Sequence, residues 1–173
     1  MASFFGYGSL VNTRTHTYGG ATGHLVGWRR CWCPVAARPA AFLSVLPDAG
    51  TTLLGLVAPV PNQDWDALDR REAQYQRIDV SDQFEGPTVV YSVPKTRVEP
   101  KLERTIWLSY LDVVLQGYLH QFGEAGPQHF METTDGWDIG ITNDRAKPHY
   151  PRAQQLSVAE TALVDDLTGH YWR

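Results

Sequence analysis

The hydrophobic pattern of the chain changes near residue 100, and this change constrains the fold more than any other feature. Before it, apolar residues come in short runs that glycine and proline interrupt, as is typical of strands joined by turns. Over residues 103–122 they recur at helical spacing, and Gly123 follows as a natural stop. A short helix is predicted over residues 126–132, and Ser157 and Glu160 form a capping box for a final helix. The sequence therefore predicts a mixed α+β fold with a helical C-terminal part.

The region before residue 100 is predicted to be mostly strands with one helix. Pro47-Asp48-Ala49-Gly50 is a favourable turn, so the runs on either side of it are expected to form a hairpin. Gly27 is expected to bend the longest strand. Asn62, a favoured N-cap residue, is expected to open a helix that ends at Ala73 or Gln74. The predicted strands cover residues 3–7, 24–37, 41–46, 51–60, 75–81 and 88–93.

Composition and charge narrow the classes of function. A length of 173 residues fits one domain, here expected as residues 1–100 with a helical extension over residues 101–173 packed on it. The net charge of -4 gives no basic field for a nucleic-acid partner, and no apolar run is long enough for a membrane. The first residues lack the pattern of a signal peptide, so a cytoplasmic protein is expected. The oligomeric state stays open.

The two cysteines, Cys31 and Cys33, are expected to be free thiols. One residue separates them, so on a strand both side chains lie on the same face, in a geometry that suits a disulfide poorly. The histidines are scattered and lack the spacing of a metal site, so no metal or cofactor is expected. A thiol nucleophile at either cysteine remains an alternative, because its base would have to come from elsewhere in the fold.

A glycine loop follows the first predicted strand, at Phe5-Gly6-Tyr7-Gly8-Ser9-Leu10. Two glycines allow a tight turn and a close approach of another group to the backbone. Several N–H groups that point the same way can bind an anion, so Tyr7, Gly8, Ser9 and Leu10 are candidates for holding a carboxylate. The spacing matches neither the dinucleotide fingerprint nor a phosphate loop. A plain turn after an aromatic strand is the alternative.

Glu72 occupies a position where the helical pattern calls for an apolar residue. It follows Trp65 and Leu68 on the same predicted stripe. Burial of a carboxyl group raises its pKa, which is how enzymes prepare a glutamate for proton transfer near neutral pH. The alternative is a helix-terminal surface acid paired with an arginine such as Arg77. Tyr75 lies close enough in sequence to contribute its hydroxyl to the same pocket.

Together these two segments resemble the γ-glutamyl cyclotransferase superfamily, which includes AIG2-like proteins and γ-glutamylamine cyclotransferases. Gly6-Tyr7-Gly8-Ser9-Leu10 is similar to the family's Y-G-S-L loop. Residues 68–75, Leu-Asp-Arg-Arg-Glu-Ala-Gln-Tyr, are similar to the stretch that carries its catalytic acid, although Ala73 stands where many members have glycine. The resemblance covers roughly residues 3 to 95. The pair Arg70-Arg71 is assigned to the surface.

The resemblance implies a fold, a reaction and roles for these residues. The fold is a small mixed β-barrel with flanking helices. Members convert a small γ-glutamyl compound into 5-oxoproline and a free amine, glutathione being the substrate of some, with no metal or cofactor. Glu72 corresponds to the catalytic acid, and the loop from Tyr7 to Leu10 holds the glutamyl end.

Two further questions stay open from the sequence. A binding or regulatory module that has kept the pocket and lost turnover is the rival to an enzyme. Arg145 and Arg152, in a segment without periodicity, either cap the pocket and bind a second carboxylate or lie in a surface loop.

Overall fold

The computed structural model describes residues 1–173, except the side chain of residue 61. The predicted α+β class is confirmed: strands dominate the first part of the chain and helices the second. The helices are α1 (Trp65–Arg71), α2 (Leu108–Phe122), α3 (Ala125–Glu132) and α4 (Val158–Thr168). The strands are β1 (Ser3–Gly6), β2 (Ala21–Cys33), β3 (Phe42–Pro59), β4 (Gln76–Asp79), β5 (Thr88–Ser92), β6 (Ile106–Trp107), β7 (Thr134–Asp135) and β8 (Ile141–Thr142).

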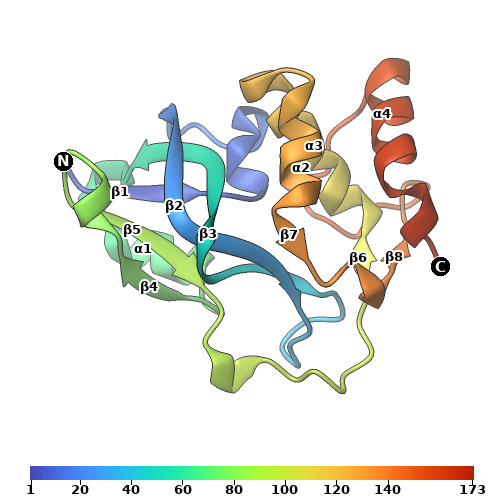
Figure 1. Ribbon diagram of the computed structural model, residues 1–173, viewed down its shortest axis with the longest axis horizontal. Coiled ribbons are helices and arrows are strands. Elements are labelled where there is room, and N and C mark those ends of the chain that lie inside the picture. The colour runs from blue at the N-terminus through green and yellow to red at the C-terminus, as the bar shows by residue number, and fades with distance from the viewer.

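A six-stranded mixed sheet forms the framework, in the order β4-β5-β1-β3-β2-β7. Strand β1 pairs antiparallel with β3 and parallel with β5, so the N-terminal strand lies inside the sheet. Figure 1 shows β1, β4, β5 and α1 at one end of the molecule and α2, α3 and α4 at the other, with the long β2–β3 pair running between them. The N-terminus and the C-terminus lie at these opposite ends.

Strands β2 and β3 pair along almost their whole length, which corrects the predicted hairpin. Residues 41–46 and 51–60 do not pair with each other; both belong to β3 and pair with successive halves of β2. The turn-like segment between them is a local bend, in which the Asp48 carboxylate accepts hydrogen bonds from the Gly50 N–H and the Thr51 hydroxyl. The register of β2 shifts at the same level, between Val26 and Trp28. The predicted bend at Gly27, where φ is 81°, is therefore confirmed.

Helix α1 is shorter than predicted at both ends. Asn62 is not its N-cap, because Asn62 adopts a left-handed φ of 52° and lies outside the helix. Asp64 caps it instead, with its carboxylate accepting a 2.9 Å hydrogen bond from the Ala67 N–H. The helix ends at Arg71, and Glu72 is its C-cap. Glu72 therefore stands at a helix terminus and not within a continuing helix to residue 73 or 74.

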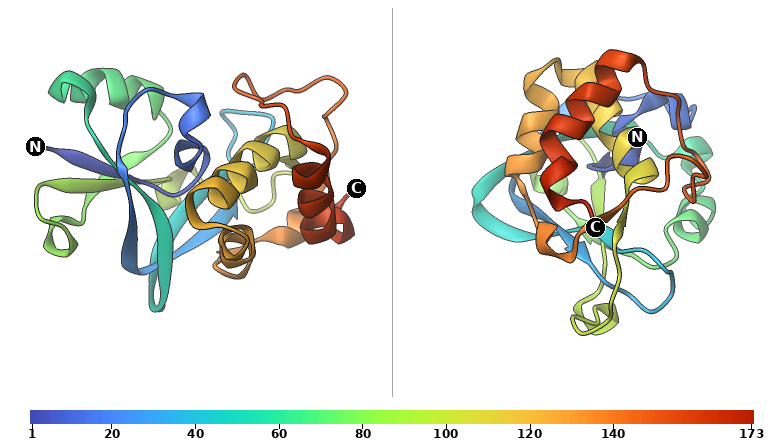
Figure 2. Two further views of the ribbon diagram at one scale, coloured as in Figure 1. Left: turned by 90° about the horizontal axis from the view of Figure 1, so that it is seen from above. Right: turned by 90° about the vertical axis from the view of Figure 1, so that its right-hand side faces the viewer.

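The C-terminal helices pack together on the end of the sheet (Figure 2). Helix α2 begins at Leu108 and not near residue 103, because residues Ile106–Trp107 form β6 and pair with β8. The predicted stop at Gly123 is confirmed, and its N–H donates to the Leu119 carbonyl. The predicted capping box of Ser157 and Glu160 is also present at α4. Within the described residues, no helix combines the length and the apolar composition that crossing a membrane requires.

Candidate active site

A cavity of about 210 Å³ lies where the glycine loop, the end of α1 and the C-terminal part of the chain meet. Tyr7, Gly8, Ser9 and Leu10 line one side of it. Glu72 and Tyr75 line another, so the loop residues and the proposed acid of the two motifs face the same space. Side chains from after residue 100 complete the wall: Trp107, Tyr110, Tyr150 and Arg152.

The glycine loop leaves β1 at Gly6 and turns at once into a short 3-10 helix, Ser9–Val11. The N–H groups of Val11 and Asn12 close this turn on the carbonyls of Gly8 and Ser9. The N–H groups that precede them lie outside the turn's own hydrogen bonds, as at any helix start. Those of Gly8 and Leu10 are therefore candidates for binding an anion in the cavity, and the Ser9 N–H faces the Tyr110 hydroxyl.

Gly8 is the position at which the loop closely approaches Tyr110 of α2. A Cβ atom at this position would lie 2.8 Å from the Tyr110 hydroxyl and 3.1 Å from Leu43 Cδ2. No real side chain tolerates the first of these distances without a shift of its neighbour. The loop and α2 thus meet at a spot that only glycine fits without rearrangement.

The hydroxyl groups of Tyr7 and Tyr75 are both anchored on backbone carbonyls. Tyr7 donates to the Tyr91 carbonyl at 2.6 Å, and Tyr75 donates to the Leu43 carbonyl at 3.0 Å. Burial raises the pKa of each phenol well above its ordinary value, so both stay protonated. The two rings form rigid walls of the cavity.

Glu72 carries the buried carboxyl group of the site. Its side chain is 17% exposed, and Arg71 Nε lies 3.3 Å from its Oε1 atom. Burial raises its pKa, and the charges of Arg71, Arg152 and Arg38 act in the opposite direction. The surface alternative, a helix-terminal acid paired with Arg77, does not hold, because Arg77 pairs with Asp69. The raised pKa of this carboxyl group is the direction of shift that general acid–base chemistry requires of a glutamate.

Arg71 was predicted at the surface, and this prediction is wrong. Its side chain is 15% exposed and lines the cavity, while Arg70 is exposed. The Arg71 guanidinium donates to the Tyr18 hydroxyl and lies over the Tyr18 ring, 5.1 Å from its centre. The helix ends at Arg71, so its side chain turns inward beside Glu72 and away from the exposed face.

Two further arginines reach the cavity from distant parts of the chain. Arg38 comes from the loop between β2 and β3, and Arg152 comes from the segment before α4. Arg145, the other arginine in question, lies elsewhere: it forms ion pairs with Asp112 at 2.7 Å and with Asp165 at 2.6 Å. The cavity therefore combines one buried acid with three guanidinium groups, a field that favours anionic ligands.

Tyr110 is the wall residue that sequence reasoning missed. The apolar residues of its helix recur at helical spacing, as in a core helix, and most of them are buried. Tyr110 instead reaches Ser9 of the loop, and its ring packs edge-on against Tyr150 at 5.0 Å. Burial raises the pKa of the Tyr110 phenol. No sequence signal distinguishes this position, because a cavity wall and a core present the same periodicity.

The thiols lie behind the cavity wall. Cys31 and Cys33 are free, as expected, with their sulfur atoms 3.2 Å apart, and neither lines the cavity. The hydrogen bond with Cys33 and burial raise the pKa of Cys31. Among the described residues, no group of three or more His, Cys, Asp or Glu side chains is arranged to hold a metal ion.

Comparison with known proteins identifies the fold. No protein-family model matches the chain, and no curated protein matches it significantly in sequence. A γ-glutamyl cyclotransferase structure aligns with a TM-score of 0.58 and 13% identity, over 95% of this chain and 98% of that chain. The structure of an uncharacterized Homo sapiens protein aligns with a TM-score of 0.59 and 13% identity, over 94% of this chain and 97% of that chain. YkqA from Bacillus subtilis aligns with a TM-score of 0.57 and 15% identity, over 78% of this chain and 56% of that chain. The chain thus has the γ-glutamyl cyclotransferase fold that its two motifs predicted.

Proposed function

We propose that this protein is a γ-glutamyl cyclotransferase-like enzyme that converts a small γ-glutamyl compound into 5-oxoproline and a free amine. The observation that carries the proposal is the cavity itself, in which Glu72 and the glycine loop face each other. The fold supports it, because a γ-glutamyl cyclotransferase structure shares the architecture along nearly its whole length.

The proposed reaction uses Glu72 twice. The α-ammonium group of the substrate gives a proton to Glu72 and becomes a nucleophilic amine. Its nitrogen attacks the γ-carbonyl carbon, Glu72 returns that proton to the leaving nitrogen, and the bond from the carbon to the leaving nitrogen breaks. The attacking nitrogen gives its second proton to the released amine, which departs as an ammonium group, so that the lactam nitrogen keeps one hydrogen. No water is consumed, and one carboxyl group can serve both transfers if its pKa lies near the working pH.

The loop is proposed to bind the glutamyl α-carboxylate through the N–H groups of Gly8, Ser9 and Leu10. Fixing that end of the substrate brings the amine and the γ-carbonyl together, which is an orientation effect. Arg38 and Arg152 add positive charge to the cavity. They favour a leaving amine that itself carries a carboxylate, as in a γ-glutamyl amino acid, over an uncharged γ-glutamyl amine.

The direct test is to incubate the protein with a panel of γ-glutamyl amino acids, γ-glutamyl amines and glutathione, and to assay 5-oxoproline. We expect release from at least one γ-glutamyl amino acid. Glu72→Gln is expected to lower kcat by about 10²–10⁴-fold with the fold retained, the range typical of a lost acid–base group. Asp66→Asn, an exposed acid on the same helix, is the matched control and should retain full activity.

Two outcomes would favour the rival functions. Binding of γ-glutamyl compounds by calorimetry without any 5-oxoproline release would indicate a binding or regulatory module. Loss of activity on alkylation of Cys31 or Cys33, with the Cys→Ser variants also inactive, would indicate a thiol acyltransferase or hydrolase. Full activity of Glu72→Gln would remove Glu72 from its assigned role.

A further inference from the structure

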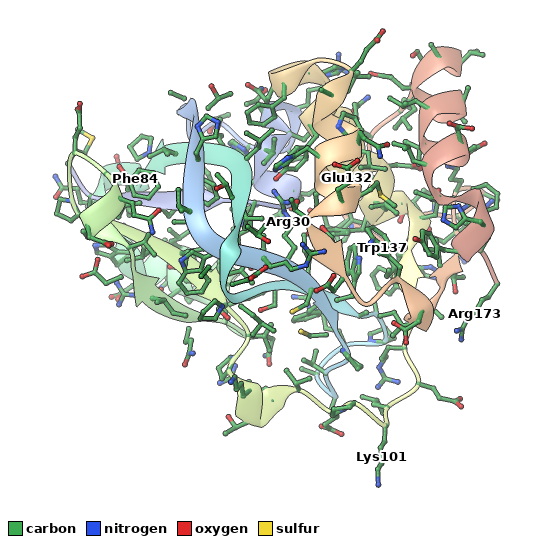
Figure 3. The ribbon with its side chains drawn as sticks, viewed as in Figure 1. Arg30, Phe84, Lys101, Glu132, Trp137 and Arg173 are labelled. Carbon is green, nitrogen blue, oxygen red and sulfur yellow. The ribbon has the colours of Figure 1, made fainter. Side chains whose placement is uncertain are left out.

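Arg30 is one of the largest fully buried side chains of the protein, with 0% exposure. It lies on β2, in the middle of the molecule between the β2–β3 pair and the helices (Figure 3). Burial of a charge is costly unless its donors are satisfied. Among the described residues no aspartate or glutamate pairs with Arg30, so other contacts must compensate its burial.

Neutral oxygen atoms and ring faces supply this compensation. Nε donates to the Tyr7 carbonyl at 2.9 Å, Nη1 to the Thr133 hydroxyl at 2.6 Å, and Nη2 to the Leu54 carbonyl at 2.7 Å. Nη2 also contacts the Tyr118 hydroxyl. The guanidinium lies 5.0 Å from the centre of the Tyr118 ring. All three nitrogen atoms of the guanidinium thus donate to groups from other elements of the fold.

Tyr118, from α2, converges on the same carbonyl. Its hydroxyl lies 2.9 Å from the Tyr7 carbonyl oxygen and 2.7 Å from that of Leu54, so it can donate to either. Burial raises the pKa of Tyr118, which keeps this donor protonated. The Tyr7 carbonyl therefore accepts from Arg30 on the core side and lies within hydrogen-bond distance of the Tyr118 hydroxyl.

The orientation of this carbonyl determines that of the next N–H group. A peptide unit is planar and trans, so its C=O and N–H bonds point in opposite directions. The Tyr7 carbonyl points toward Arg30 in the core. The Gly8 N–H belongs to the same peptide and points away from Arg30, and Gly8 itself lines the cavity.

We propose that Arg30 and Tyr118 are positioning residues, which fix the Tyr7–Gly8 peptide so that its N–H serves as an anion donor in the cavity. Donation to the carbonyl oxygen also polarises the peptide and strengthens its N–H as a donor. The inference rests on the proposed function, in which the loop holds the glutamyl carboxylate. Neither residue touches the substrate, and both act through the peptide.

Tyr118→Phe is the decisive variant, because it removes the hydroxyl and keeps the ring that packs on Phe122 and Phe130. We expect KM for γ-glutamylalanine to rise about tenfold with kcat nearly unchanged, since a contact to the carboxylate is the same in ground and transition states. Thr168→Val removes a buried hydroxyl far from the loop and is the control. It should lower stability and leave KM unchanged.

Arg30 is tested by two replacements. Arg30→Leu should raise KM more than Tyr118→Phe does, and Arg30→Lys, which keeps the charge, should recover part of that loss. If neither folds, Tyr118→Phe alone decides. A folded Tyr118→Phe variant with wild-type KM would overturn the inference.

A binding measurement separates this inference from the proposed reaction. The affinity of each variant for 5-oxoproline is measured by calorimetry, which needs no turnover. Weaker binding by Tyr118→Phe supports the positioning role even if no γ-glutamyl compound is converted, in which case only the proposed reaction fails. Equal affinity of variant and wild type, or no binding by the wild type, overturns the positioning role.

Discussion

Glu72 links the stability of the protein to pH. Its pKa is raised by burial, so the folded protein holds this proton more tightly than the unfolded chain does. The stabilising contribution is present below the ordinary value of 4.5 and is lost as pH rises through the raised value. At neutral pH the ionised carboxylate therefore lowers the free energy of unfolding.

We accordingly expect Glu72→Gln to gain stability relative to wild type as pH rises. The gain is about 1.4 kcal/mol for each unit by which the pKa of Glu72 is raised. Urea unfolding at about pH 4 and about pH 7.5 measures the difference. A stability difference that stays constant over this range would mean that Glu72 is solvated in the folded state.

Gly8→Ala is expected to impair substrate binding. The new Cβ would meet the Tyr110 hydroxyl at 2.8 Å, so the loop or Tyr110 must move. We expect KM for a converted γ-glutamyl compound to rise at least about tenfold, and Gly8→Val to abolish binding, since overpacking costs about 1–3 kcal/mol. Gly50→Ala, where a Cβ meets only ordinary contacts, is the control. Unchanged KM in Gly8→Ala would separate the loop from the ligand.

At the level of single residues, the sequence was informative where a residue broke a local rule. Glu72 interrupted an apolar stripe, and the paired glycines interrupted a strand, so both could be singled out. Tyr110 obeyed its helical pattern, and Arg38 lies in a loop without any pattern. Their places in the cavity depend on tertiary packing and could not be predicted.

Among the elements, α2 fixes the loop most directly. Asn12, which follows the loop's 3-10 helix, donates through its side-chain amide to the Val113 carbonyl at 2.9 Å and to the Gln116 side chain at 3.0 Å. Gly117 lies at this crossing, where a Cβ would be 2.6 Å from the Asn12 backbone nitrogen. The loop and the helix are therefore in direct backbone contact.

Gly117→Ala should destabilise the protein even though alanine favours helices by about 1 kcal/mol over glycine. The clash is with backbone atoms, so we expect a net loss on the order of 1–3 kcal/mol in thermal or urea unfolding. It should also lower kcat/KM, because α2 carries Tyr110. Gly169→Ala, with a helical φ of -56° and open space around its Cβ, should be neutral or slightly stabilising. Equal stability of Gly117→Ala and wild type would show that α2 shifts freely against the loop.

Most element types were predictable, and element boundaries were predictable only where a local cap sets them. Gly123 and the Ser157 capping box marked helix ends correctly, because each acts through its own backbone or side chain. The Pro47–Gly50 segment failed as a hairpin turn because pairing with β2 outweighed its local preference. Helix α2 begins later than its pattern, since Ile106 and Trp107 pair with β8. In both cases a distant strand decided the outcome.

For the molecule as a whole, Arg145 connects the C-terminal elements. It pairs with Asp112 of α2, whose side chain is 7% exposed, and with Asp165 of α4. Arg145→Leu leaves a buried carboxylate without its partner, so we expect a loss of roughly 2–4 kcal/mol in the free energy of unfolding. Activity per folded molecule should stay at the wild-type level. Arg70→Leu, an exposed arginine, should change stability by less than about 0.5 kcal/mol. A loss of activity in folded Arg145→Leu would place Arg145 in the site.

The overall class was predictable because strand and helix patterns are local in sequence, and the meeting of the two motifs was predicted from the family resemblance. The part played by the region after residue 100 was not, because its wall residues come from a helix and from an aperiodic segment. That the first loop and Arg152 share one cavity follows only from the folded arrangement.

This arrangement has a consequence for biosynthesis. When translation has reached residue 100, both signature motifs have been synthesised, yet Tyr110, Tyr150 and Arg152 have not. At that stage Glu72 and the glycine loop would lack the residues that complete the cavity around them. The proposed turnover should therefore begin only late in translation, when the segment that carries Arg152 has completed the cavity.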